Sequence, residues 1–255
     1  MKRVLKWVGL ALLVVVLAFA GIVFAAFHGL SPIEDGRWSL AGLQTVKDGI
    51  VSCYLVDLGE REVALVDACN DKSAQAILVG LAKRGLGPEA VKAILLTHGD
   101  SDHIAGALAF PKAQVMALAA DVPLAEGRET RFLKGLLPPK DTGVRVGRAL
   151  ADGEVVELSG VTFRVYAVPG HTKGSAAFLA RGVLFMGDSA EATTEGALAP
   201  AKRLTSDDPA LNRASLAKLA QRLAPSAAEV MAIAPAHSGV LLKGLAPLTD
   251  FARVH

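Results

Sequence analysis

Residues 95–103 read Leu-Leu-Thr-His-Gly-Asp-Ser-Asp-His, and they close an apolar run that begins at Val91. Two histidines and two aspartates therefore stand within six residues, at the end of a segment with the composition of a buried strand. Buried ionisable groups are costly unless they are paired or bound to a metal, and a simple turn requires no histidine. This stretch predicts a metal or proton-transfer site, which the rest of the chain positions and completes.

The composition limits the classes of protein to consider. The chain has 255 residues with 27 basic and 25 acidic side chains, so no basic surplus indicates nucleic acid as a partner. The two cysteines, Cys53 and Cys69, are too few for a disulfide framework or a cysteine-rich zinc site. They fall near opposed positions of a predicted hairpin. There they form either a single disulfide in an exported domain or two small buried apolar residues.

The N-terminal segment is strongly apolar. Residues 7–27 are 21 positions without a charge, and as a helix they would span roughly 31 Å, about one bilayer core. Positive charges precede the run, so Met1 is expected on the cytoplasmic side and the remainder outside the cytoplasm. A signal peptide cleaved near Ala-Phe-Ala at 18–20 is the alternative, although the length of the run favours an uncleaved membrane anchor.

These observations predict three parts. Residues 1–27 are a transmembrane anchor or a signal peptide, residues 28–37 are a linker with turn signals, and residues 38–255 are the functional domain. The domain is then held at the membrane on the periplasmic or extracellular face, or secreted if the N-terminal segment is cleaved.

The domain alternates between strand and helix patterns. Hairpins followed by a helix occur in both parts of it, which favours one α/β domain of two similar halves. The last predicted helix has a plausible cap at Ser206 or Asp207. The predicted strands are residues 40–46, 50–58, 63–66, 91–96, 114–118, 154–158, 161–168, 175–179, 183–186 and 230–234, and the predicted helices are residues 72–84, 104–108 and 207–223.

Four of the predicted strands end in side chains that can bind a metal. Strand ends gathered at one edge of a sheet make a rigid cluster, and imidazole with carboxylate is a donor set for zinc, iron or manganese. Two ions roughly 3.5–4 Å apart can clamp a bridging hydroxide and polarise a carbonyl or phosphoryl oxygen. The candidate ligands are, in chain order, His98, Asp100, Asp102, His103, His171, Asp188 and His237.

In this order the motifs resemble those of the metallo-β-lactamase superfamily. They are Leu-Val-Asp at 65–67, Thr-His-Gly-Asp-Ser-Asp-His at 97–103, Pro-Gly-His-Thr at 169–172, Met-Gly-Asp at 186–188 and Pro-Ala-His at 235–237. The resemblance covers nearly the whole domain and implies a four-layer αββα sandwich, here preceded by an N-terminal hydrophobic helix.

The resemblance also implies a ligand set for two divalent metal ions, with zinc as the expected metal. His98, Asp100 and His171 would form the first site, and Asp102, His103 and His237 the second. Asp188 would bridge the two sites, and Asp67 would brace the loop from behind the ligands.

One position departs from the family pattern. The usual motif is His-x-His-x-Asp-His, and this chain has Asp100 in place of the middle histidine. The flavodiiron branch carries a glutamate there and holds iron, so a carboxylate is compatible with binding in the family. An aspartate is shorter and harder than imidazole. It is expected to weaken zinc at the first site relative to iron or manganese, or to leave that site partly filled.

Residues 125–148 form a long basic stretch without a clear period, interrupted by Pro138-Pro139. Such a stretch is typical of either a substrate lid or a solvated surface loop. A lid of this charge would suit an anionic or amphiphilic substrate. The lid candidates are Arg128, Arg131, Phe132 and Lys134.

The resulting prediction is a metal-dependent hydrolase of a small-molecule ester, thioester, lactone or related substrate. A metal-bound hydroxide would attack the substrate, with Asp102 as the catalytic carboxylate that orients it. Two alternatives are a membrane-tethered metal-binding protein without turnover and an iron-dependent redox enzyme. The carboxylate at position 100 motivates both.

Overall fold

The structure is a computed structural model that describes residues 7, 10, 12–17, 21, 28–38, 42–131 and 138–254. The chain forms two compact units, Met1–Leu30 and Ser31–His255. In the first unit, residues 12–17 are helical and exposed. The described residues include no helix of the length and apolar character needed to cross a bilayer. Most of the predicted anchor or signal at residues 1–27 lies outside the described residues.

The first sheet of the second unit has seven strands, ordered in space as they are in the chain. Strands β1 to β4 pair in antiparallel fashion, and β4 to β7 pair in parallel. Parallel neighbours end at the same edge of the sheet, so the residues after β4 and β5 meet there. The strands are β1 Gly36–Arg37, β2 Leu43–Asp48, β3 Val51–Gly59, β4 Glu62–Val66, β5 Val91–Leu96, β6 Gln114–Leu118 and β7 Arg148–Leu150.

The second sheet has five strands in the order β14-β11-β10-β9-β8. Its pairs are antiparallel except for β11 and β14, which run in parallel and therefore end at one edge. The strands are β8 Val155–Leu158, β9 Val161–Ala167, β10 Ala176–Ala180, β11 Val183–Gly187 and β14 Ala232–Pro235, and a separate small ribbon consists of β12 Ala190–Ala192 and β13 Leu198–Pro200.

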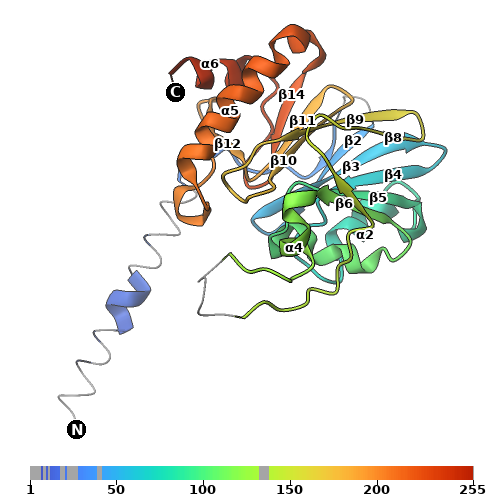
Figure 1. The fold of residues 1–255 in the computed structure, drawn as a ribbon. Coiled ribbons are helices and arrows are strands. Elements are labelled where there is room, and N and C mark those ends of the chain that lie inside the picture. Colours follow the sequence, from blue (N-terminus) through green and yellow to red (C-terminus); the bar gives the residue numbers. More distant parts are fainter. Residues whose placement is uncertain are drawn as a thin grey trace. The chain divides into compact units, whose positions relative to one another are not determined.

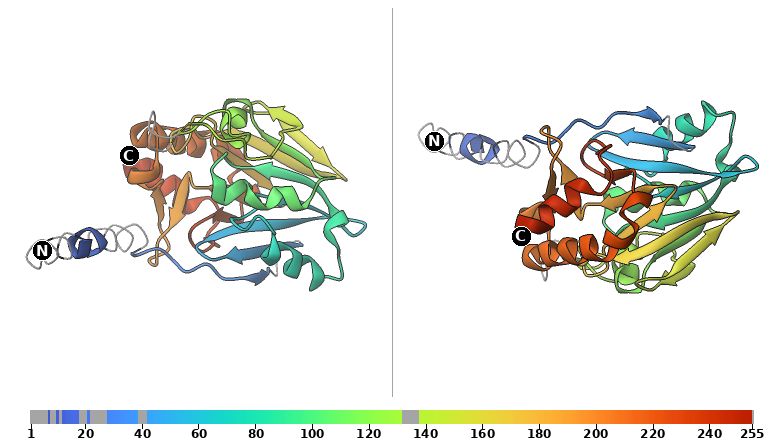
Figure 2. Two further views of the ribbon diagram at one scale, coloured as in Figure 1. Left: turned by 90° about the horizontal axis from the view of Figure 1, so that it is seen from below. Right: turned by 90° about the horizontal axis from the view of Figure 1, so that it is seen from above.

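The two sheets pack face to face, and helices cover their outer faces (Figures 1 and 2). One apolar core lies between the sheets and includes Tyr54, Phe163 and Phe185. Two further cores lie under the helices: α2 packs through Ile77, whereas α5 and α6 cover the second sheet. The predicted αββα arrangement is thus observed. The helices are α2 Gln75–Ala82, α3 Ser101–Ile104, α4 Val122–Ala125, α5 Pro209–Leu223 and α6 Ala246–Val254, with 3-10 turns η1 Pro88–Ala90, η2 Ala105–Ala109, η3 Ala119–Asp121, η4 Arg203–Thr205 and η5 Ala224–Glu229.

The segment predicted as a linker, residues 28–37, is divided between the two units. From Ser31 onward it belongs to the sandwich, because the Ser31 amide donates to the Ala192 carbonyl at 2.9 Å and its carbonyl accepts from the Gly239 amide at 2.9 Å. Strand β1 then pairs with β2. These backbone hydrogen bonds explain why turn residues in this segment belong to the domain and not to a free connection.

Several helix boundaries differ from those predicted. Helix α2 begins at Gln75 and not at residue 72, because Asp71 accepts from the Ser73 and Gln75 amides and holds the preceding turn open. The predicted helix at 104–108 instead begins at Ser101 as α3 and continues as η2. The cap of α5 is Asp208, whose carboxylate accepts from the Ala210 and Leu211 amides, so the prediction of Ser206 or Asp207 was wrong.

Cys53 and Cys69 form a disulfide, with their Cα atoms 5.4 Å apart. We expected Cys69 on the hairpin, but it lies three residues beyond the end of β4, so that expectation was wrong. The disulfide therefore joins β3 to the loop that follows Asp67. The Ala68 amide in this loop also donates to the His103 carbonyl at 2.6 Å, so the disulfide lies beside the strand ends described below.

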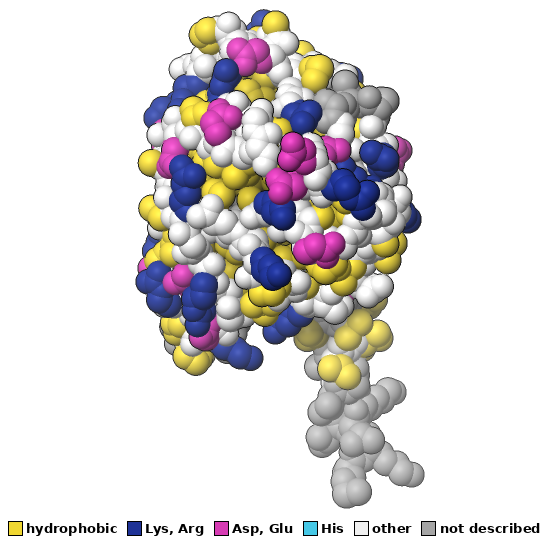
Figure 3. Space-filling model, turned by 90° about the vertical axis from the view of Figure 1, so that its right-hand side faces the viewer, with side chains coloured by type: hydrophobic (Ala, Val, Ile, Leu, Met, Phe, Trp, Pro, Cys, Tyr) yellow, Lys and Arg dark blue, Asp and Glu magenta, His cyan; other side chains and the backbone are white. Residues whose placement is uncertain are grey.

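The surface carries both signs of charge. Acidic and basic side chains are interspersed over the face shown in Figure 3, without a large field of one sign. The net charge of the chain is +2.

Candidate metal centre

The seven candidate ligands are brought together from both sheets. His98 and Asp100 follow β5, Asp102 and His103 lie in α3, and the other three follow strands of the second sheet. Asp188 directly follows β11, while His171 and His237 lie a few residues beyond β9 and β14. The structure thus gathers all seven at facing strand ends, although metal ligation itself stays a prediction.

Two groups of three ligands can be distinguished in this centre. The first group is His98, Asp100 and His171, and the second group is Asp102, His103 and His237; in each, the ligand atoms lie within 4.8 Å of one another. A third set of this kind, His98, His103 and Asp188, connects them. Asp188 Oδ1 lies 3.1 Å from His103 Nε2 and 3.3 Å from His237 Nε2, and Oδ2 lies 3.6 Å from His171 Nε2.

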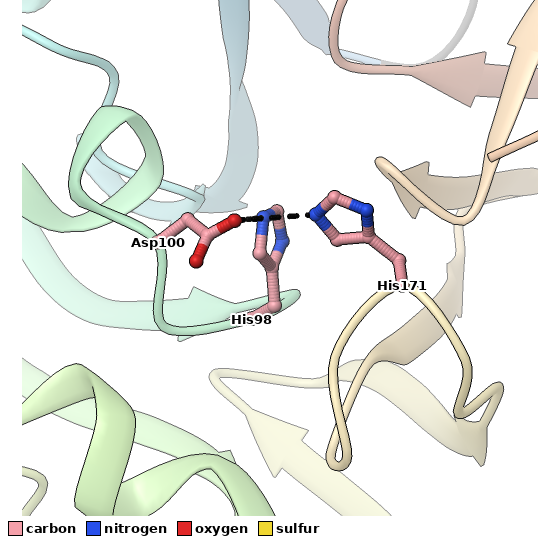
Figure 4. Close-up of side chains that lie close together, drawn as sticks. All are labelled: His98, Asp100 and His171. Atoms are coloured by element: carbon pink, nitrogen blue, oxygen red, sulfur yellow. Dashed lines mark hydrogen bonds and ion pairs between the residues drawn. The ribbon is translucent and has the colours of Figure 1, made fainter. Parts of the chain in front are cut away.

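The side chains of the first group point toward one another (Figure 4). Asp100 Oδ2 lies 3.5 Å from His98 Nε2 and 3.2 Å from His171 Nε2. In the second group, Asp102 Oδ2 lies 3.2 Å from His237 Nε2 and 3.8 Å from His103 Nε2. Both groups therefore set a carboxylate against two imidazole nitrogens.

Two histidines of the second group are fixed by hydrogen bonds on the outer side of the ring. His103 Nδ1 donates to Asp67 Oδ2 at 2.9 Å, and His237 Nδ1 donates to the Ile50 carbonyl at 2.7 Å. Each bond assigns the Nδ1 proton and turns Nε2 into the centre, which is how an outer partner orients a ligand histidine.

The first group has the same arrangement through two hydroxyl groups. Thr97 gives its own proton to Asp67, so His98 Nδ1, at 3.1 Å, donates to the Thr97 oxygen. Ser206 likewise gives its proton to the Lys202 carbonyl, which leaves its oxygen to accept from His171 Nδ1 at 3.4 Å. All four histidines therefore direct Nε2 inward.

Asp67 supports the centre from behind the ligands. Its side chain is 3% exposed, and it accepts from the Thr97 amide and the Thr97 hydroxyl, each at 2.7 Å, in addition to His103. The Asp67 backbone has φ 59°, a left-handed conformation that is uncommon for a residue other than glycine. One carboxylate thereby ties the end of β4 to the end of β5 and to α3.

Charge interactions in the second group favour ionised partners. Burial opposes the charged forms, but the carboxylates of Asp188 and Asp67 raise the pKa of His103 well above its usual value. The pKa of His237 rises to about 10, because Asp188 and Asp102 outweigh burial. Burial raises the pKa of Asp102, but His237 and His103 together outweigh burial and lower this pKa to about 2. The same two histidines hold the pKa of the buried Asp188 well below its usual value.

Arg131 joins the first group, although the sequence suggested a lid position for it. Its Nε donates to Asp100 Oδ1 at 2.7 Å, and its Nη2 donates to Asp100 Oδ2 and lies 2.9 Å from His171 Nε2. Burial is the largest single influence on Asp100 and raises its pKa, but the hydrogen bonds from Arg131, His171 and His98 together outweigh it, so the pKa lies well below its usual range. Burial lowers the pKa of His171, and the Arg131 charge lowers it further.

The other lid candidates lie elsewhere. Arg128 is 59% exposed and pairs with Glu126 at 2.9 Å, so the structure does not bring it to the ligands. Phe132 and Lys134 lie outside the described residues.

The buried donor atoms show which part of the centre fits a metal. Within the described residues, His98 Nε2, His103 Nε2 and Asp188 Oδ1 are buried and have no hydrogen-bond partner. Buried polar atoms are rarely left unpaired, and here all three face the same space. The inward nitrogen of His103 and the oxygen of Asp188 therefore fit a divalent cation at the second group, and His98 offers a similar nitrogen on the side of the first group. In the first group, the donor atoms of Asp100 and His171 are engaged by Arg131.

Asp121 is a supporting residue that sequence reasoning missed. It is 1% exposed, and its two oxygens accept from the Gly99 amide at 2.7 Å and the Gly174 amide at 2.8 Å. It thereby connects the two ligand loops of the first group. The backbones pass closely here, because a Cβ on Gly99 would lie 2.5 Å from the Ala125 nitrogen. A signal was present, since Asp121 follows a predicted strand, as Asp67 and Asp188 do.

Comparisons with known sequences identify a family and a number of relatives, among them two hydroxyacylglutathione hydrolases. A family model described as the metallo-β-lactamase superfamily matches residues 46–237. The hydroxyacylglutathione hydrolase of Serratia proteamaculans is 33% identical over 137 residues, which cover 54% of this chain and 42% of that protein. The enzyme of the same name from Aeromonas hydrophila is 32% identical over 168 residues, which cover 66% of this chain and 52% of that protein. The chain spans about half the length of these curated relatives.

A comparison with solved structures finds the same fold. A subclass B3 metallo-β-lactamase of Bradyrhizobium japonicum aligns with a TM-score of 0.62 at 21% sequence identity. The aligned part covers 90% of this chain and 93% of that chain.

Proposed function

Because the chain belongs to the metallo-β-lactamase superfamily, we propose that it is a metal-dependent hydrolase of an ester, thioester or lactone. The observation that carries this proposal is the orientation of the histidines. All four fix Nδ1 on an outer partner and turn Nε2 toward Asp188 or the carboxylates beside it. Such a preorganised set of nitrogen and oxygen donors suits Zn²⁺, and its carboxylate content also suits Fe²⁺ or Mn²⁺.

A divalent metal bound by this centre would supply an activated water and polarise the scissile carbonyl. The residues supply position and charge. Asp67 and the Ile50 carbonyl hold the rings of His103 and His237, so that neither ring has to reorient during the reaction. Asp102 is half-buried and, with a pKa of about 2, ionised at neutral pH, so it can accept a hydrogen bond from the attacking water and orient it.

The substrate class is proposed from the relatives. Both curated relatives are named hydroxyacylglutathione hydrolases, a name that describes release of a hydroxyacyl group from glutathione. A hydroxyacyl thioester is therefore the first substrate to test, before a lactone, a simple ester and a β-lactam.

The proposal is tested by turnover of that panel with zinc-, iron- and manganese-loaded protein, and with Asp102→Ala. We expect turnover of at least one substrate, and a fall in kcat/KM of at least about 100-fold in the variant. Asp250→Ala is a matched control, because Asp250 is exposed and pairs only with Arg253 among the described residues. Equal turnover by Asp102→Ala and the wild type would contradict the assigned role of Asp102.

One observation supports the alternative of a metal-binding protein without turnover, namely the capture of Asp100 by Arg131. The same panel separates the two functions. A chain that binds metal tightly and hydrolyses none of the four substrate classes would favour that alternative.

We also propose that the domain acts outside the cytoplasm. The Cys53–Cys69 disulfide supports this location, since structural disulfides persist in oxidising compartments. The apolar run at residues 7–27 would deliver the domain there as an anchor or a signal. Cell fractionation with an antibody against the domain tests this, and recovery of a reduced domain in the cytoplasm would contradict it.

A further inference from the structure

Among the described residues, Arg131 is the arginine that forms an ion pair with a ligand of this centre, Asp100, and it also pairs with Asp207, which is not a ligand. It precedes the undescribed residues 132–137, and its side chain is 14% exposed. Its guanidinium spans Asp100 through two parallel hydrogen bonds, and its Nη1 lies 3.3 Å from Asp207 Oδ1. A planar fork held by two carboxylates and largely removed from solvent is a fixed part of the site, unlike a surface pair.

The hydrogen bonds of Arg131 use the donor atoms that a metal in the first group would need. A guanidinium has only donors, so the contact at 2.9 Å places an N–H of Arg131 on the lone pair of His171 Nε2. Both oxygens of Asp100 accept from Arg131 as well. A metal and this guanidinium cannot share these lone pairs, so occupation by one excludes the other.

The charges agree with this assignment. The family pattern has a neutral histidine where this chain has Asp100, so the first group gains one negative charge. Arg131 places one positive charge at hydrogen-bond distance from Asp100, so the pair of Arg131 and Asp100 is neutral. A divalent ion beside a guanidinium would instead be repelled, and the repulsion is strong where burial lowers the effective dielectric constant.

The carboxylates of the second group have no arginine or lysine partner among the described residues. Within residues 42–131 and 138–254, the ion pairs of Asp102 and Asp188 are formed with histidines alone. Buried inward nitrogens without a hydrogen-bond partner occur in both groups, at His103 in this group and at His98 in the first. The groups therefore differ at Asp100 and His171, whose donor atoms are engaged by a guanidinium, whereas no described guanidinium or ammonium group engages the carboxylates of the second group.

We propose that Arg131 takes the place of the first metal, so that the chain binds one metal, at Asp102, His103, His237 and Asp188, and uses the guanidinium as the fixed cation of the first group. This inference rests on the proposed function, because it specifies how many metals the hydrolase holds. It adds a residue, Arg131, whose side chain determines that number.

The experiment is a zinc titration of the full chain, read by calorimetry and by elemental analysis after dialysis. We expect one equivalent in the wild type and two in Arg131→Ala, because removal of the guanidinium frees the lone pairs of Asp100 and His171. Arg131→Gln is a second variant that keeps most of the side-chain volume and removes the charge, and it is expected to bind two equivalents. Arg128→Ala, which removes an exposed arginine from the same loop, is expected to bind one.

Three other results of the zinc titration would contradict the inference. Two equivalents in the wild type would overturn this inference and leave the proposed hydrolase intact. One equivalent in both folded Arg131 variants would also overturn it, because the guanidinium would then not be what limits binding. A folded wild-type chain that binds no metal would overturn the proposed function and this inference together.

Discussion

The two groups of the centre share an architecture and differ in the cation that their residues select. The first group pairs its carboxylate with Arg131, whereas the carboxylates of the second group are paired with histidines. The second group is also held from behind by Asp67 and the Ile50 carbonyl. A single residue, Asp100, accounts for the difference, because its negative charge and two oxygens fit a guanidinium fork. The same fold can therefore keep the metal position of the second group and replace the metal of the first group with a guanidinium.

The largest difference in bound metal between the two groups is expected when one histidine of each group is replaced by alanine. His103→Ala removes an inward nitrogen and leaves the buried Asp67 without its imidazole partner. We expect it to lose bound metal and at least about 100-fold in kcat/KM. His171→Ala, its counterpart in the first group, should keep one metal equivalent after dialysis. Equal metal loss in both variants would show that the two groups act as one site.

Removal of the disulfide tests how much it stabilises the loop that follows Asp67, which supports the second group. The disulfide closes a loop with a sequence separation of 16, so Cys53→Ala/Cys69→Ala is expected to lose about 3 kcal/mol of unfolding free energy. Urea denaturation of the variant measures this loss, and the wild type in reductant should show a similar shift. An unchanged midpoint in both would contradict a supporting role for the disulfide.

Asp67→Asn tests how strongly the second group depends on its outer partner. The substitution keeps the side-chain volume and removes the charge that orients His103. Metal affinity is expected to fall roughly 10- to 100-fold, the range for the loss of such partners. Competition with a chromophoric chelator measures the change. An unchanged affinity in a folded variant would mean that His103 is positioned by other contacts.

The smallest effect is expected near the first group, at the cap of α5. Asp208→Ala removes the acceptor for the Ala210 and Leu211 amides beside the His171 loop. The loss is expected to be about 1 kcal/mol of unfolding free energy, without a change in metal equivalents. Thermal unfolding and elemental analysis together check this result. Loss of metal in this variant would show that the first group also holds an ion.

The strand ends were predictable from the sequence because the strands are short, apolar and buried. β5 and β6 occur at the predicted residues, and each remaining predicted strand has a counterpart within a few residues. The ligand-bearing motifs follow these strands, so their convergence could be anticipated. The three-residue strands β7, β12 and β13 were missed, since so few residues carry no recognisable period. Helix α6 was also missed.

The direction of side chains in loops was not predictable. Ser206, Asp207 and Asp208 are three consecutive potential caps, and only the contacts of their side chains in the folded chain distinguish them. Ser206 donates to the Lys202 carbonyl and Asp207 pairs with Arg131, which leaves Asp208 to cap the helix. Arg131 shows the same limit, because its sequence context indicates a basic loop but not that its guanidinium turns into the first group.

The most direct test of the asymmetric centre is anomalous diffraction from crystals of the zinc-loaded full chain, measured on both sides of the zinc edge. We predict a single peak among Asp102, His103, His237 and Asp188, with the Arg131 guanidinium still on Asp100. A second peak of similar height among His98, Asp100 and His171, with Arg131 displaced from Asp100, would contradict the account.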